Sequence, residues 1–211
     1  MFIPDWWKST PKSKYSDDQS LSPEYTIKTC TAFKELYSNG IIQPLWSDLN
    51  LKVYPDGKYE YQFADSVSTI TDHQEWQHEG SPYSNGQHTQ VKLISPWVAK
   101  SKNNIKWLFT SPYWSGQGVG DMHVSHGIMP FNVIPSAMHV NMFFRRREAP
   151  FVYRLEFGTP LAHIIPLTDK EVKINYHLVS EQELDNMQRH STINFFFLNR
   201  FTKAKKRCPY A

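Results

Sequence analysis

The sequence predicts a mainly β protein whose body is an antiparallel β-sandwich, a jelly roll or a β-clip-like fold, with a short N-terminal helix and a C-terminal helix. Short segments of alternating apolar and polar residues recur through the middle of the chain, separated by Pro, Gly, Asn or Ser. Helical segments do not alternate with these strands, which disfavours a parallel Rossmann-type sheet. We expect three parts: an extended arm (1–26), a β-rich domain (27–179), and a C-terminal helix with a basic tail packed on that domain (180–211).

The arm is predicted from its composition. Three prolines interrupt any helix there, and Ser and Asp dominate residues 9–22. The tip of the arm carries Phe2, Trp6 and Trp7, and burying such an aromatic side chain is worth roughly 1.5–3 kcal/mol. We therefore expect these three side chains to contact either the body of the chain or a protein partner.

The body is expected to begin with a helix and a hairpin. Apolar residues at helical spacing predict a helix over Thr29–Tyr37, which Gly40 ends in a left-handed conformation. Alternation then predicts two strands, at 49–53 and 59–63. The Pro55-Asp56-Gly57 sequence between them supplies the backbone angles of a tight turn.

Seven more strands and a second helix complete the predicted fold. The strand segments lie at 90–98, 105–110, 128–134, 138–144, 151–157, 161–167 and 172–178. The polar stretch 66–89 holds three of the nine histidines and predicts a long loop at the rim of the sheet, of a kind that is uncommon unless functional or mobile. Ser180 followed by Glu183 fits a capping box and predicts where the second helix begins.

The charge distribution indicates anion-binding candidates at two places. The chain has 23 basic and 20 acidic residues, a net charge of +3, which is too small for a general polyanion binder. The basic excess lies in residues 189–211, where six residues are basic and none is acidic. The candidates are Lys203, Lys205, Lys206 and Arg207 in this tail, and the triplet Arg145, Arg146 and Arg147. The alternatives are a tail that offsets a helix dipole and a triplet that is simply solvated.

Four residues are weak candidates for a metal site: Asp121, His123, His126 and His139. Two histidines and a carboxylate are the ligand set of non-haem iron oxygenases, so iron or zinc would be the metal. Their order is inverted from the His-x-Asp motif of that class, and neighbouring glycines predict a loop here. We therefore expect no cofactor. The sequence also lacks a Gly-x-Ser-x-Gly elbow and a phosphate loop, so no complete catalytic set is present.

The location of the protein follows from what the chain contains. No stretch approaches the ~20 apolar residues needed to span a bilayer, and the first residues do not form a secretory signal. Cys30 and Cys208 are expected to be free thiols. We expect a protein that is neither secreted nor membrane-spanning.

Several motifs resemble a family of uncharacterised proteins encoded by tailed bacteriophages, especially marine and cyanobacterial ones. They lie at residues 6–8, 26–30, 40–46, 93–97 and 157–166, so the resemblance extends over most of the chain. It implies a location in the virion or in the cytoplasm of an infected bacterium, and it implies no particular activity.

The segment from Gly158 to Pro166 is also similar to the late strand of the dUTPase and dCTP-deaminase β-clip fold. Those enzymes carry a catalytic aspartate after a pair of glycine and an apolar residue. Here Gly127-Ile128 is followed by Met129, so the carboxylate is missing, and His163 stands where a glutamine would be. The similarity implies a shared β topology without the nucleotide chemistry.

These observations lead to one main hypothesis and two alternatives. The main one is a non-enzymatic phage protein that acts through protein contacts, as a virion component or a modulator of a host component, and that forms homo-oligomers. The first alternative is a metal-dependent enzyme of the double-stranded β-helix class. The second is a protein that binds nucleotides or nucleic acid through its arginines and basic tail.

Overall fold

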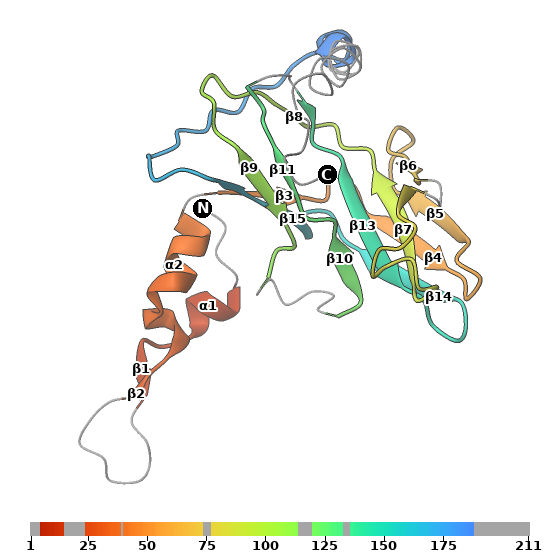
Figure 1. Cartoon of the computed structure of the whole chain (residues 1–211), viewed down its shortest axis with the longest axis horizontal. Helices are drawn as coiled ribbons and strands as arrows, with labels where there is room; N and C mark the ends of the chain where they lie inside the picture. The colour runs from red at the N-terminus through yellow and green to blue at the C-terminus, as the bar shows by residue number, and fades with distance from the viewer. Residues whose placement is uncertain are drawn as a thin grey trace, which may run out of the picture.

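A computed structural model describes residues 5–14, 24–38, 40–73, 77–113, 120–132 and 136–187 of the chain. The fold is mainly β, with several antiparallel sheets and a few short helices, as predicted. Figure 1 shows a sandwich-like β body and, projecting from it, a smaller unit built from the N-terminal helices and two very short strands. We call this unit the foot; it comprises the described residues between 5 and 38.

Three sheets build the body, and every strand pair in them is antiparallel. The first sheet has the order β10 (Met122–Val124), β13 (Val140–Arg145), β7 (His88–Leu93) and β6 (Ile70–Thr71). The second has the order β11 (Gly127–Met129), β9 (Trp107–Thr110), β15 (Pro160–Pro166) and β3 (Ile41–Pro44). The third has the order β14 (Phe151–Leu155), β4 (Leu49–Val53) and β5 (Tyr59–Phe63). A two-stranded sheet joins β12 (Ser136–Ala137) to β8 (Val98–Ala99).

The inner faces of the three sheets share a single hydrophobic core. Alternation in β4 turns Leu49, Leu51 and Val53 inward, where each is essentially inaccessible to solvent. They meet Phe144 of β13 and Ile164 of β15 in the same cluster of buried residues. Because the apolar side chains of all three sheets converge there, burial of this common core is the main stabilising contribution to the body.

Most of the predicted strands are confirmed. The hairpin of β4 and β5 pairs Leu49 with Phe63 through Val53 with Tyr59, around a turn in which Gly57 has φ +89°. The strands expected near 105–110, 138–144, 151–157 and 161–167 correspond to β9, β13, β14 and β15. The segments at 90–98 and 128–134 are only partly strand.

Two strand predictions are wrong, each for an identifiable reason. Residues 172–178 alternate but form no strand; Tyr176 and Leu178 lie exposed at 71% and 101%. Alternation reports which face a side chain prefers, and it does not supply a neighbouring strand. Conversely, β10 lies where the nearby glycines predicted a loop, because its residues find a partner in β13.

The N-terminal arm is not simply extended. Asp5–Ser9 forms helix α1, and β1 (Ser13–Lys14) pairs with β2 (Glu24–Tyr25). A proline disrupts a helix only from within, and Pro4 precedes the first helical residue rather than interrupting it.

The foot continues with η1 (Ile27–Thr29) and α2 (Thr31–Ser38), close to the predicted helix.

The capping box predicted at Ser180 and Glu183 is confirmed. The backbone N–H of Ser180 donates to the Glu183 carboxylate over 3.0 Å, and that of Glu183 donates to the Ser180 hydroxyl over 3.3 Å. In the part of the chain that the structure describes, no helix is long and apolar enough to cross a membrane.

Gly40 does not adopt the left-handed conformation predicted for it, since it is absent from the glycines with positive φ. Its role is steric instead. A Cβ at this position would lie 2.8 Å from Nε2 of His163 and 3.1 Å from the carbonyl oxygen of Ile164. The chain entering β3 can therefore lie this close to β15 only without a side chain.

Replacing Gly40 by Ala should therefore destabilise the protein by roughly 1–3 kcal/mol, because one of the two obstructing atoms belongs to the backbone and cannot move aside easily. The matched control is Gly127→Ala, since a Cβ at Gly127 would meet nothing within 4 Å. Urea unfolding of both variants measures the difference. Equal stability of the two variants would contradict this account of Gly40.

Candidate functional site

A continuous stack of four aromatic rings joins the foot to the body. The ring centroids lie 4.2 Å apart between Trp7 and Phe33, 4.9 Å between Phe33 and Tyr37, and 5.0 Å between Tyr37 and His163. Trp6 adds an edge contact to Phe33 at 5.6 Å. The two described tryptophans proposed as partner contacts thus pack on the chain itself: Trp7 is buried and Trp6 is partly buried.

His163 is the anchor of the stack in the body. It lies on β15 with only 2% of its surface exposed, and burial lowers its pKa to about 4. Above it, Tyr37 is also buried, which raises its pKa to about 12, and its hydroxyl donates a hydrogen bond to the carbonyl of Tyr113. The histidine is therefore neutral at ordinary pH and acts as a flat packing surface for the tyrosine ring.

Acid should destabilise the protein through His163. Below its ordinary pKa of 6.5, the unfolded chain binds a proton at this position that the folded chain does not bind. Stability is therefore lost as the pH falls from about 6.5 towards 4, by about 3 kcal/mol at the lower limit. The dependence of the free energy of unfolding on pH, between about pH 7 and pH 5, should be shallower for His163→Gln than for the wild type. His177→Gln, at an exposed histidine, is the control, and an unchanged slope in His163→Gln would contradict the assignment.

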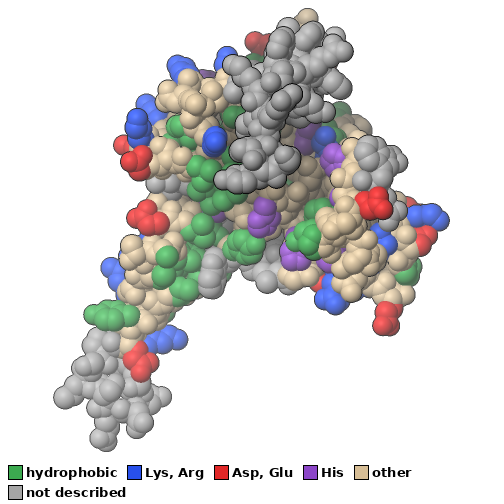
Figure 2. All heavy atoms as spheres, viewed as in Figure 1, with side chains coloured by type: hydrophobic (Ala, Val, Ile, Leu, Met, Phe, Trp, Pro, Cys, Tyr) green, Lys and Arg blue, Asp and Glu red, His purple; other side chains and the backbone are tan. Residues whose placement is uncertain are grey.

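The outer face of the second sheet is apolar and only partly covered. Alternation turns Ile165 of β15 away from the core, and the register places Leu108 opposite Ile165 and Ile128 opposite Leu108. We call these three side chains the apolar row. Ile128 is 55% exposed, and Tyr113, whose carbonyl holds Tyr37, is 53% exposed. Figure 2 shows hydrophobic side chains gathered on the viewed face where the foot meets the body.

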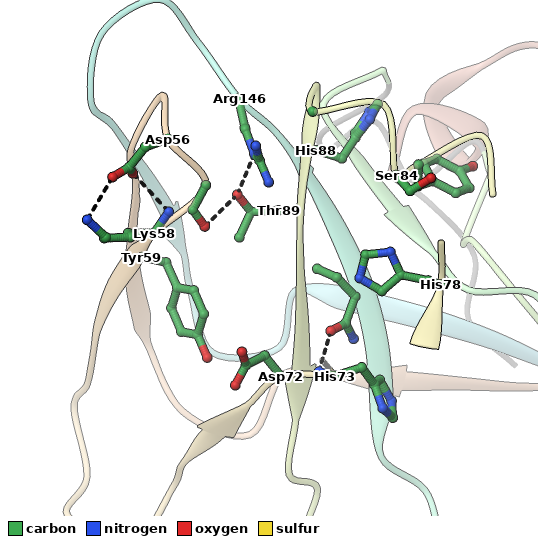
Figure 3. Close-up of a pocket in the computed structure, with 14 residues that line it drawn as sticks. Asp56, Lys58, Tyr59, Asp72, His73, His78, Ser84, His88, Thr89 and Arg146 are labelled. Carbon is green, nitrogen blue, oxygen red and sulfur yellow. Dashed lines mark hydrogen bonds and ion pairs between the residues drawn. The ribbon is translucent and has the colours of Figure 1, made fainter. Parts of the chain in front are cut away.

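A pocket of about 490 Å³ lies at a different place, beside the hairpin turn between β4 and β5. Its walls come from that turn, the residues after β6, the loop from His78 to Gly86, the start of β7, and Arg146 just after β13. Figure 3 shows Arg146 and Thr89 towards one end of the pocket and Asp72 and Tyr59 towards the other, with His78 and His88 on a third side. Its volume is typical of sites that bind small molecules.

Arg146 is held in place at the pocket wall. Its Nε donates to the Thr89 hydroxyl over 3.2 Å, and its backbone N–H donates to the Gln87 carbonyl over 2.7 Å. Its guanidinium lies against the turn, because a Cβ on Gly57 would stand 2.3 Å from Nη2. The ion pairs of the described residues do not include Arg146.

Three residues that line the pocket each have a buried polar atom without a hydrogen-bond partner among the described residues: Nδ1 of His78, Nδ1 of His88 and Nε2 of Gln90. Burial, followed by the positive neighbours His123, Arg145 and Arg146, lowers the pKa of His88. At the opposite end, burial and then the negative charge of Asp72 raise the pKa of Tyr59 to about 12. The pocket therefore has an anionic end at Asp72, and Arg146 at the other end is accompanied by the ion pair of Lys58 and Asp56.

The structure separates the three arginines of the triplet. Arg145 is exposed, and its carbonyl accepts a hydrogen bond from the Tyr153 hydroxyl. Arg147 forms an ion pair with Asp121 at 2.6 Å, so its charge is already neutralised. Arg146 alone lines the pocket. The three guanidiniums thus occupy different surroundings.

The four metal candidates have separate partners. Asp121 holds Arg147, and His123 lies beside Tyr83 and His88, at 5.8 and 5.9 Å between ring centroids. His126 lies near Tyr113, and Nδ1 of His139 accepts the Ser95 backbone N–H over 3.1 Å. Burial, followed by the charge of Lys92, lowers the pKa of His139 to about 4. Within the described ranges, no group of three or more His, Cys, Asp or Glu residues could hold a metal ion.

Other candidates fall outside the described residues, namely Phe2 and the tail residues Lys203, Lys205, Lys206 and Arg207. Cys30 is a free thiol and is exposed, and Cys208 lies outside the described residues. No sequence motif predicted the pocket as a site. The signal was present in the polar stretch 66–89, whose three histidines, His73, His78 and His88, all line the pocket.

No protein-family model, curated protein or solved structure matches the chain.

Proposed function

We propose that this chain is a non-enzymatic protein that works by binding other protein chains, and that one of these partners is a second copy of itself. The observation that carries the proposal is the apolar row, together with the exposed Tyr113. Ile128 and Tyr113 each leave more than half of their surface in water. Covering such side chains gains about 25 cal/mol for each Å² of apolar surface removed from water.

The charge and topology of this face favour a second copy as the occupant. The apolar row and Tyr113 carry no formal charge, so two identical faces can meet without opposing like charges. A two-fold axis brings the same surface of both chains together, which requires a surface complementary to itself. Ile128 lies on β11, which ends its sheet among the described strands, so its free edge is open to antiparallel pairing with β11 of the other copy.

The foot supports the same proposal. It projects from the body beside this face and is held there by the stacked rings (Figure 1). A projecting unit of this kind adds little to the core of its own chain, and it extends the surface that a partner can contact. The resemblance to proteins of tailed phages favours an assembly role in a virion or binding to a host component.

The proposal predicts that the wild-type chain is a dimer and that Ile128→Glu is a monomer, because the substitution would bury two carboxylates against an apolar face. Size-exclusion chromatography with light scattering measures the mass directly. Val67→Glu is the matched control, since Val67 is 84% exposed, lies outside the apolar row, and receives the same charge. A wild-type chain that stays monomeric at all concentrations, or an Ile128→Glu variant that stays dimeric, would contradict the proposal.

A further inference from the structure

We propose that the pocket beside the β4–β5 turn binds the phosphate group of a small organic phosphate, with Arg146 as its principal ligand. This inference is independent of self-association, because the pocket and the apolar row share no residues. It concerns one pocket and one class of ligand. Four features of the site support it.

The first feature is the set of unused polar atoms in the pocket wall. Gln90 is only 8% exposed, and its Oε1 accepts the backbone N–H of His73 over 2.8 Å. Its Nε2 nevertheless has no partner. A buried amide left without a hydrogen bond costs about 1–3 kcal/mol, and Nδ1 of His78 and of His88 add to that cost. Such an arrangement is unfavourable unless these atoms gain hydrogen-bond partners that the described residues do not provide.

The second feature is the preparation of Arg146. Thr89 accepts from its Nε, the Gln87 carbonyl fixes its backbone, and the glycine at position 57 allows the guanidinium to lie directly on the turn. Among the described residues, no hydrogen bond or ion pair uses Nη1 or Nη2 of Arg146. These two nitrogens form the fork with which arginine binds the oxygens of an oxyanion in a bidentate manner.

The third feature separates phosphate from carboxylate. A carboxylate has two oxygens, which one guanidinium can satisfy alone, whereas a phosphate monoester offers three oxygens in different directions. The pocket provides further donors on separate elements: the Gln90 amide on β7 and the imidazoles of His78 and His88. Thr89, which holds Arg146, lies on the opposite face of β7 from its neighbours His88 and Gln90, so an anion uses both walls only at the edge of β7 that β6 leaves unpaired.

The fourth feature indicates what the phosphate is attached to. The pocket is larger than the phosphate group needs, and its other end presents Asp72, Tyr59 and His73 (Figure 3). A carboxylate accepts hydrogen bonds from hydroxyl groups and repels a second anion. The ligand class is therefore a small, hydroxyl-bearing molecule with one phosphate, and a polyanion such as a nucleic-acid strand is disfavoured.

Isothermal titration calorimetry on the full chain tests the proposal with three probes: ribose 5-phosphate, inorganic phosphate and ribose. The wild type should bind ribose 5-phosphate most tightly, inorganic phosphate more weakly, and ribose not measurably. Arg146→Gln should weaken ribose 5-phosphate binding by about tenfold or more, which is the scale of one charge-assisted contact. Arg146→Lys keeps the charge and loses the fork, so its affinity for ribose 5-phosphate should lie between those of the wild type and Arg146→Gln.

The matched control is Arg154→Gln, which removes the same charge from an exposed side chain on β14 that does not line the pocket. This control should bind ribose 5-phosphate with an affinity within about twofold of the wild type.

Gln90→Glu is a second test that does not depend on Arg146. It keeps the acceptor for His73 and replaces the unused donor by a negative oxygen, so it should also abolish binding. Thermal melting confirms that each variant is folded.

Three results would overturn the proposal. One is a wild-type chain that binds no ribose 5-phosphate, and another is equal binding of ribose and ribose 5-phosphate. The third is an equal loss of affinity in Arg154→Gln and Arg146→Gln, since that would show a diffuse effect of positive charge instead of a site.

Discussion

The placement of the foot on the sandwich depends on the contact between the ring of Tyr37 and the buried imidazole of His163. Strand β15 is used on both of its faces, with Ile164 in the core and His163 beneath the foot. The contact requires that the imidazole stay neutral, because a buried charge without a partner is strongly unfavourable. It also requires that the chain enter β3 closely, which Gly40 permits. The foot is positioned from this point, and the Tyr37 hydroxyl bonds the carbonyl of Tyr113 beside it.

The fold class and most strands could be predicted from the sequence because they depend on local pattern. The hairpin of β4 and β5 has alternation in both strands and a turn sequence that suits its backbone, and it formed as expected. The segment from Val172 to Leu178 has the same alternation and no strand beside it. Strand pairing depends on two segments. The alternation in one segment predicts which side chains share a face, and it does not predict that a second strand lies alongside.

The candidate site was less predictable, because it depends on which distant residues meet. Three consecutive arginines suggested one cluster of charge, yet Arg147 is neutralised by Asp121 and only Arg146 reaches the pocket. Asp121, His123, His126 and His139 are close in sequence and have separate partners in space. The long polar stretch 66–89 was identified as unusual, and it supplies much of the pocket wall. Its histidines could not be assigned to a site without knowing that Arg146 and the hairpin turn lie opposite them.

Arg146 touches parts of the molecule that belong to two different sheets. It follows β13, its backbone is bonded to the residue before β7, and its guanidinium lies on the turn of the third sheet. A ligand bound to this side chain would connect two sheets that otherwise contact each other mainly through their apolar inner faces. Such a ligand binds the folded chain and has nothing to hold in the unfolded one, so its concentration adds to the resistance of the sandwich to heat. Occupancy of the pocket and the thermal stability of the folded body would then rise together.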